Sequence, residues 1–202
     1  MTLSDFLSKA TRERWATAHF NASTLEQMRV ICRVCRDLKS PAIIGTSEGE
    51  RGHIGLLEAV ALRSALRHEF GIPVFLNADH SKSIESAKTA VDAGYDSIHI
   101  DLSALPFEGN VKGTAEVVAY AKQKSEILNP PTLGKPKARP GKYEISVEGE
   151  LGYLRGESRI QKEKIEVKAE DLTDPGEARE FVEKTGVDRL AIAVGNIHGL
   201  AL

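Results

Sequence analysis

Residues 73–83 read PVFLNADHSKS, and this stretch decides the predicted fold. The apolar run at 73–76 is typical of a strand buried in a sheet. It is followed almost at once by Asp79 and His80, which do not suit a dry interior. One interpretation is a surface turn whose acid precedes the cap of the next helix. The other is that a buried strand carries an acid and an imidazole into an active site.

Strands of this kind alternate with amphipathic helices along the chain. We expect strands at 17–21, 42–47, 74–79, 97–101, 144–151 and 190–195. We expect helices at 25–38, 54–69, 83–93, 110–124 and from Pro175 to Gly186. Strands that alternate with helices indicate parallel βαβ units, which build either an open doubly wound sheet or a barrel.

The positions of the polar residues favour the barrel. Polar side chains stand at or just after the predicted strand ends, at Ser47, Asp79, His80, Asp101, Glu150 and His198. In a barrel the carboxyl ends of all the strands surround one opening, so catalytic residues come from several strands. In a doubly wound sheet we would expect them to be concentrated beside the single crevice where the strand order reverses. No GxGxxG follows the first strand and no GxxxxGK[ST] occurs, so nucleotide binding has no support. We therefore predict an α/β fold of the (β/α)8 TIM-barrel class.

Composition sets the domain organisation and excludes several partners. The 202 residues suit one domain over 1–202, with a Pro/Lys-rich insertion at 128–142 that is a lid, an oligomer contact or a solvated loop. The formal net charge of −2 gives no electrostatic reason to bind nucleic acid or an anionic membrane. No apolar run reaches the ~20 residues of a membrane helix, and the N-terminus lacks the apolar core of a secretion signal. We expect a cytoplasmic protein.

The two cysteines, Cys32 and Cys35, form a Cys-x-x-Cys within a predicted helix. A redox pair or half a zinc site is one interpretation, but redox pairs usually stand at a helix N-terminus. Two packed, buried thiols are the favoured interpretation. Two cysteines cannot build a disulfide framework, which agrees with a reducing compartment.

The strand ends also offer candidate metal ligands. His80, Glu150 and His198 match the three protein ligands of a typical catalytic zinc. The alternative is that His198 is a polar loop residue and Glu150 a surface acid. We expect His99 to be a satisfied core or interlayer histidine, and the orientation of His19 stays open.

Several segments together resemble one known family. These segments are HFNASTLEQM (19–28), IIGTSEG (43–49), ADH (78–80), DAGYDSIHIDLSALPFEGNV (92–111), VEGELG (147–152) and TGVDRLAIAVGNIHG (185–199). In this combination and order the chain resembles the class II, metal-dependent fructose- and tagatose-bisphosphate aldolases, over roughly residues 16–199. The resemblance implies a (β/α)8 barrel that reversibly cleaves a ketose 1,6-bisphosphate to dihydroxyacetone phosphate and an aldehyde. For fructose 1,6-bisphosphate, in glycolysis, that aldehyde is glyceraldehyde 3-phosphate.

The resemblance also implies roles for individual residues. His80 and His198 resemble zinc ligands, and Glu150 a ligand for zinc in an alternative position. Asp101 resembles a carboxylate that helps to place the metal or its ligands, and Asp79 the acid/base at the hydroxyl that loses its proton.

Four further residues are assigned on the same ground. Asn21 and Ser47 resemble substrate contacts. Gly195 and Gly199 resemble backbone that approaches phosphate and a monovalent cation, Na+ or K+. A homo-oligomer is implied for the full-length protein. The metal-free class would need a lysine inside the barrel, and the predicted strands from 42–47 onward contain none.

Two departures from the family pattern limit these expectations. A third zinc histidine and a phosphate loop would follow residue 202, so we expect an incomplete, C-terminally truncated barrel of about six of the eight βα units. In the loop after 144–151, Arg155 replaces a glycine, and Glu157 is the nearby acid that could serve as base or be an exposed loop residue.

Two alternatives therefore remain open beside fructose-bisphosphate cleavage. The first is an aldolase-like enzyme for another phosphosugar, and the second is an inactive barrel fragment that acts as a binding or assembly partner. The sequence does not distinguish fructose from tagatose bisphosphate, which differ at one stereocentre.

Overall fold

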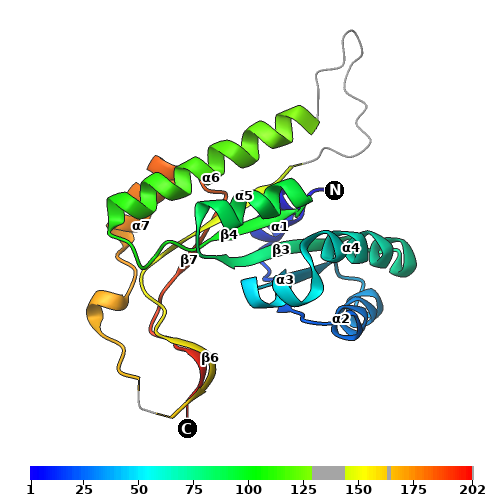
Figure 1. The fold of residues 1–202 in the computed structure, drawn as a ribbon, viewed down its shortest axis with the longest axis horizontal. Coiled ribbons are helices and arrows are strands. Elements are labelled where there is room, and N and C mark those ends of the chain that lie inside the picture. Colours follow the sequence, from blue (N-terminus) through cyan, green and yellow to red (C-terminus); the bar gives the residue numbers. More distant parts are fainter. Residues whose placement is uncertain (129–143, 163–164, 202) are drawn as a thin grey trace.

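The computed structural model describes residues 1–128, 144–162 and 165–201. Six parallel strands form its main sheet, which curls as part of a barrel would (Figure 1). In sheet order these strands are β1 (Phe20–Asn21), β2 (Ala42–Thr46), β3 (Val74–Ser81), β4 (Ser97–Ile100), β5 (Ser146–Leu151) and β7 (Arg189–Ile192). Sheet order follows chain order without the reversal that defines a doubly wound sheet. The prediction of an incomplete TIM-type barrel is confirmed.

Helices cover the outer face of the sheet (Figure 1). They are α2 (Leu25–Asp37), α3 (Glu48–Ile54), α4 (Leu56–Phe70), α5 (Ile84–Ala93), α6 (Phe107–Leu128) and α7 (Pro175–Thr185). The starts of α2, α3, α5 and α7 carry side-chain caps, such as the Thr24 hydroxyl that accepts the amide of Gln27. Glycines at Gly94 and Gly186 take the left-handed conformation that ends α5 and α7.

The strands present an apolar face to these helices. Ile44, Leu76, Ile98 and Val147 alternate with the inward residues and join one large buried cluster with the helices. The opposite, concave face has a smaller apolar cluster, where α1 (Leu3–Glu13) packs Leu3 and Phe6 against Ile43 and Phe75. Further along the strands the concave face becomes polar, and this polar region holds the candidate site.

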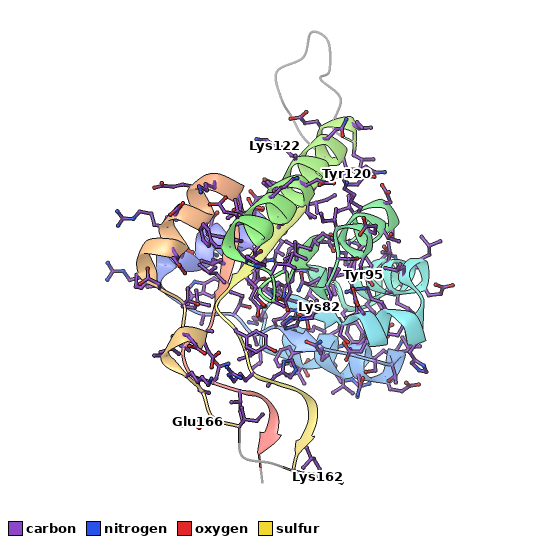
Figure 2. All side chains as sticks on the ribbon, turned by 60° about the vertical axis from the view of Figure 1, so that its left-hand side comes forward. Lys82, Tyr95, Tyr120, Lys122, Lys162 and Glu166 are labelled. Atoms are coloured by element: carbon purple, nitrogen blue, oxygen red, sulfur yellow. The ribbon has the colours of Figure 1, made fainter. Side chains whose placement is uncertain are left out.

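The structure contains elements that the sequence interpretation missed. These are α1, α3, the 3-10 turn Ala169–Asp171, and the parallel pair β6 (Gly156–Gln161) with β8 (His198–Ala201). The β6–β8 pair forms a small second sheet beyond the main one. Lys162 and Glu166, which follow β6, lie apart from the strand ends of the main sheet, where Lys82 lies (Figure 2).

Two expectations are not tested by this structure. Residues 129–143 lie outside the described part of the chain, so the insertion predicted at 128–142 stays a prediction, as does the assignment of a single domain. Within the described ranges, no helix combines the length and the apolar character that crossing a bilayer requires.

The two cysteines lie on the inward face of α2. Cys32 is fully buried and Cys35 nearly so, and both are free thiols. Burial raises the pKa of Cys32 to about 11 and also raises the pKa of Cys35. The packed-thiol interpretation is confirmed, and both cysteines lie inside α2, away from the helix N-terminus where redox pairs usually lie.

We therefore expect both cysteines to resist alkylation in the folded protein. Compared with a free thiol of pKa ~8.5, the Cys32 pKa of about 11 lowers its thiolate population at neutral pH by roughly 300-fold. Intact-mass analysis after iodoacetamide treatment should show unmodified native protein and two added carbamidomethyl groups in denaturant. Rapid labelling of the native chain would contradict the burial of α2.

Candidate active site

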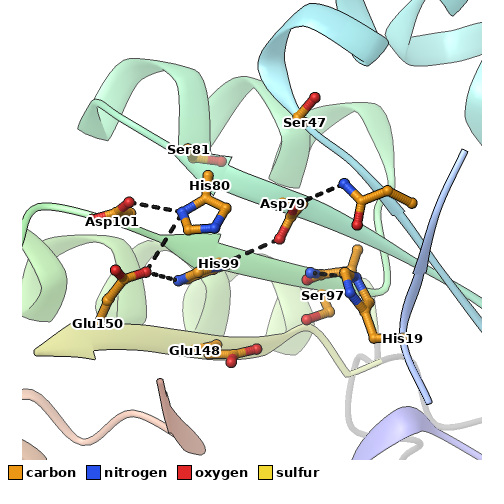
Figure 3. A network of polar contacts seen from close by, with 12 residues as sticks. His19, Ser47, Asp79, His80, Ser81, Ser97, His99, Asp101, Glu148 and Glu150 are labelled. Atoms are coloured by element: carbon orange, nitrogen blue, oxygen red, sulfur yellow. Dashed lines mark hydrogen bonds and ion pairs between the residues drawn. The ribbon is translucent and has the colours of Figure 1, made fainter. Parts of the chain in front are cut away.

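The candidate site forms on the concave face because side chains alternate along each strand. On β3 and β4 the inward residues are Asn77, Asp79 and His99, and Asp101 follows β4 on the same side (Figure 3). On β5 the inward residues include Glu148 and Glu150. Parallel strands in register bring these positions close together, since His99 pairs across the sheet with Glu148.

A backbone irregularity lets two consecutive residues reach the same site. In a regular strand Asp79 and His80 would face opposite sides of the sheet. The pairing of β3 with β4 shifts register between Ala78 and Ser81, and His80 has φ of 44°, in the left-handed region. Such a bulge redirects a side chain. Arg51 supports it, because its buried guanidinium donates to the Asp79 carbonyl oxygen at 3.1 Å.

His80 lies between carboxylates of the neighbouring strands. Its Nδ1 is 2.8 Å from Oδ2 of Asp101 and 3.5 Å from Oε2 of Glu150. Asp101 also pairs with Lys82 and accepts the Ser103 hydroxyl at 2.7 Å. Burial would raise the pKa of Asp101, but the contacts from His80, Lys82 and Ser103 lower it well below its usual range.

Asp79 is held as a carboxylate by a second set of contacts. The Asn21 amide donates to its Oδ2 at 2.9 Å, and His99 Nδ1 is 3.4 Å from its Oδ1. Burial would raise the pKa of Asp79, but His99, Asn21 and the charge of His80 lower it far below the ordinary value. The site therefore presents an ionised acid at neutral pH.

His99 bridges the two sets of contacts. Its Nε2 is 2.9 Å from Oε2 of Glu150, and its ring centroid is 4.4 Å from that of His80. Burial would lower the pKa of His99, but the carboxylates of Asp79 and Glu150 raise it to about 10. His99 is buried, as expected, but it is part of the polar cluster and not an isolated core histidine.

His198 and its neighbours approach this cluster from the other sheet. The His198 ring centroid is 5.8 Å from that of His80, and its backbone amide donates to the Arg155 carbonyl oxygen at 2.8 Å. His198 therefore begins β8 and is not a free loop residue. Gly195 and Gly199 on either side have φ of 100° and 91°, conformations that favour glycine.

The remaining predicted residues are placed differently. Ser47 caps α3: its hydroxyl accepts the Glu50 amide at 3.4 Å, and its own amide donates to Oε2 of Glu50 at 2.7 Å. The Asn21 amide donates to Glu50 as well as to Asp79. The two residues expected to contact substrate, Asn21 and Ser47, therefore both bond the Glu50 side chain. Glu157 is in β6 and not in a loop, and its side chain lies outside the described residues.

The sequence alone does not assign three residues to this site: His99 is expected in a core or interlayer role, the orientation of His19 stays open, and Lys82 is not considered. His99 could have been found from the alternation of Ser97, His99 and Asp101, which marks one face of the strand. His19 lies over Gly45 and within 3.2 Å of the Asn77 amide nitrogen, a long-range contact with no local signal. Lys82 follows β3 because that strand runs to Ser81, two residues past its predicted end.

The donor atoms fit a divalent transition-metal ion. Two groups among the described residues have ligand atoms within 4.8 Å of one another, Asp79–His80–His99 and His80–Asp101–Glu150. Imidazole and carboxylate together are the usual ligands of zinc and related ions. Such a cluster at the carboxyl ends of a curled parallel sheet is typical of metal-dependent enzymes of the βα-barrel class.

Comparison with known proteins places the chain within that class. It belongs to the class-II fructose-bisphosphate aldolase family, whose model matches residues 1–128 and 138–201. The family is generally metal-dependent, in agreement with the imidazole and carboxylate groups at the strand ends.

Individual relatives support this membership. The chain is 35% identical over 199 residues to a fructose-bisphosphate aldolase of Giardia intestinalis, covering 98% of this chain and 54% of the relative. It is 34% identical over 202 residues to that of Geobacillus stearothermophilus, covering 98% and 62%. The crystal structure of the YdjI aldolase from Escherichia coli K12 superposes with a TM-score of 0.73 at 29% identity, covering 97% and 62%. The chain thus spans between about half and two thirds of the length of these proteins.

Proposed function

We propose that this site performs the reversible, metal-dependent aldol cleavage of a ketose 1,6-bisphosphate. Fructose 1,6-bisphosphate is the proposed substrate, and dihydroxyacetone phosphate and glyceraldehyde 3-phosphate are the proposed products, in glycolysis. The observation that supports this most directly is the bulge in β3, which brings the ionised Asp79 and the His80 imidazole to one cluster with Asp101 and Glu150. A cytoplasmic location and a homo-oligomeric state remain predictions from the family resemblance.

The proposed cofactor is Zn2+, held by His80 and His198, with Glu150 as a ligand in an alternative position and Asp101 as the carboxylate that helps to place the ion. When bound there, the ion supplies Lewis-acid stabilisation of the negative charge that develops on the substrate. The proposed site for a monovalent cation, Na+ or K+, and for substrate phosphate is the backbone at Gly195 and Gly199. Both residues are glycines with positive φ, so no Cβ stands between this backbone and an approaching phosphate or cation.

Asp79 has the proposed role of proton acceptor at the hydroxyl next to the bond that breaks. It must be ionised to accept that proton, and its lowered pKa meets this condition. The Asn21 amide donates to Oδ2 of Asp79 and so fixes the orientation of the carboxylate that is to accept the proton. We assign Ser47 to substrate binding and Glu157 to proton transfer at the substrate carbon.

A second candidate is an aldolase that acts on another phosphosugar. It is favoured by Arg155, whose guanidinium Nη2 donates to Oδ1 of Asp171 at 2.8 Å just before β6. This contact anchors the segment that carries Glu157 in a position set by pairing of β6 with β8. This changed segment around Arg155 and Glu157 is the reason to consider a phosphosugar other than fructose 1,6-bisphosphate as the substrate.

The test is a coupled assay for triose phosphate release by the purified 202-residue chain with one equivalent of Zn2+. We expect cleavage of fructose 1,6-bisphosphate that a chelator abolishes and zinc restores. Preference for tagatose bisphosphate or another ketose phosphate in the same assay would support the second candidate. A chain that holds zinc and cleaves no member of the panel would contradict both and favour a binding or assembly role.

A further inference from the structure

We propose that Arg51 is a positioning residue for the proposed acid/base: its planar guanidinium fixes the peptide between Asp79 and His80, and so sets the direction of both side chains. The kinetic part of this inference rests on the proposed function, because Arg51 acts through Asp79 and has no assigned contact with substrate or metal. The sequence did not indicate this role, since Arg51 belongs to α3, a helix that the sequence interpretation did not find.

The guanidinium of Arg51 joins the ends of two neighbouring strands. Its Nη1 donates to the carbonyl oxygen of Thr46, the last residue of β2, at 2.6 Å, and to that of Asp79 in β3 at 3.1 Å. Its Nη2 donates to the hydroxyls of Ser81 at 3.3 Å and of Ser86 in α5 at 3.4 Å. One side chain therefore connects β2, β3 and α5 beside the candidate site.

The Asp79 carbonyl oxygen stands where the pairing of β3 with β4 is interrupted. Regular pairing stops at Ala78 and resumes at Ser81. His80 has φ of 44° there, and within the described part of the chain it is the one non-glycine residue of positive φ inside a strand. A conformation of this kind persists only where the surroundings hold it. The Arg51 guanidinium supplies such a contact at the peptide that precedes His80.

Fixing this peptide fixes both functional side chains. The carbonyl group of Asp79 and the amide of His80 belong to one planar unit, so a rotation of that plane changes ψ of Asp79 and φ of His80 together. In the present orientation Oδ2 of Asp79 accepts the Asn21 amide at 2.9 Å. His80 Nδ1 lies 2.8 Å from Oδ2 of Asp101 (Figure 3). In a regular strand the two side chains would instead point to opposite faces of the sheet.

The burial of Arg51 indicates that its guanidinium does more than fill space. The residue is 5% exposed, and its four hydrogen bonds all go to neutral oxygen atoms. Its ion pair with Glu48 is long, at 3.9 Å, and the Glu48 side chain is 44% exposed. Burying a charge without a close partner is unfavourable, and an apolar side chain would avoid this cost. Only a guanidinium presents a rigid, planar set of donors to several acceptors at once.

The experiment compares Arg51→Met with the wild-type chain by NMR and in the triose phosphate assay. Methionine keeps an unbranched apolar stem but has no donor. The left-handed φ of His80 brings its amide proton close to its Hα, so the wild type should give a strong NOE between them, with neither metal nor substrate present. We expect Arg51→Met to weaken this NOE to the level of extended residues.

The same variant should lower kcat by roughly 100-fold, the effect of misplacing a reacting group by about 1 Å. KM should stay nearly unchanged, because the loss concerns the acid/base and not the backbone proposed to bind phosphate at Gly195 and Gly199. A variant that merely lost stability would show neither the weakened His80 NOE nor this difference between kcat and KM at a temperature where circular dichroism shows it folded.

Arg63→Met is the matched control. Arg63 is also a buried arginine of the helix layer, 7% exposed, but it donates to Asp96 and to the Gly94 carbonyl oxygen, neither of which is part of the bulge. This variant should lose thermal stability and keep both the strong His80 NOE and the wild-type kcat. Loss of the His80 NOE in Arg63→Met as well would overturn the assignment to Arg51.

Arg51→Lys keeps the inference testable if Arg51→Met does not fold. Lysine retains the buried charge, but its ammonium is a compact point charge and not a planar fork, so the His80 NOE and kcat should both fall below those of the wild type. An unchanged NOE in either folded variant, or a wild type without the strong His80 NOE, would overturn this inference. A weakened NOE in the variants of a chain that cleaves no ketose bisphosphate would support the positioning of His80 and contradict the proposed function alone.

Discussion

Asp79→Asn should lower kcat for ketose bisphosphate cleavage by roughly 10²–10⁴, the usual contribution of a positioned acid/base. The amide has the size of the carboxylate, but it cannot accept a proton, and its single carbonyl oxygen can accept from only one of Asn21 and His99. Metal content should be preserved, because the proposed zinc ligands His80, His198 and Glu150 are unchanged. The measurement is kcat in the triose phosphate assay together with zinc content by atomic emission.

The matched control for this variant is Asp92→Asn. Asp92 is an exposed acid in the last turn of α5 that bonds Lys124 and Tyr120 of α6. Its kcat should equal that of the wild type. The prediction would be contradicted if both variants had kcat values within about threefold of the wild type. Another group would then have to accept the proton, and Glu157 would be the first to test.

Asp96→Ala should destabilise the fold by roughly 3–5 kcal/mol, the cost of breaking a buried ion pair from one side. Asp96 Oδ1 accepts Arg63 at 2.5 Å and Arg67 at 2.9 Å, and its Oδ2 accepts the Leu76 amide at 2.8 Å. Its removal leaves the buried Arg63 guanidinium without its carboxylate and frees a backbone amide within β3. At ~2–4 °C per kcal/mol for a chain of this size, Tm should fall by roughly 10 °C.

Asp92→Ala is the control for this prediction as well. Its ion pair with Lys124 has the same kind of geometry, at 2.7 Å, but both side chains are partly exposed. Exposed pairs contribute ~0–1 kcal/mol, so Tm should change by no more than a few degrees. Denaturant unfolding followed by circular dichroism compares the two variants, and a loss below 1 kcal/mol in Asp96→Ala would argue that solvent reaches Arg63.

Much of the fold could be predicted because local patterns of apolar and polar residues indicate the strands and helices. The expected strands and helices around 42–101 match β2, α4, β3, α5 and β4 to within a few residues. The omissions had local signals too: Thr2 with Asp5, and Ser47 with Glu50, form capping boxes that start α1 and α3. The β6–β8 pair had no such signal, because two short strands distant in sequence specify each other only through tertiary contact.

The sequence by itself determined the order of the βα units and the presence of acids and imidazoles at strand ends, because hydrophobic periodicity and polar interruptions are properties of neighbouring residues. Only the tertiary structure decided that Asp79 and His80 face the same side, since the bulge depends on how β3 pairs with β4. It also decided that His99 lies between Asp79 and Glu150. Strand register and bulges are set by packing between segments far apart in the chain, which no local pattern contains.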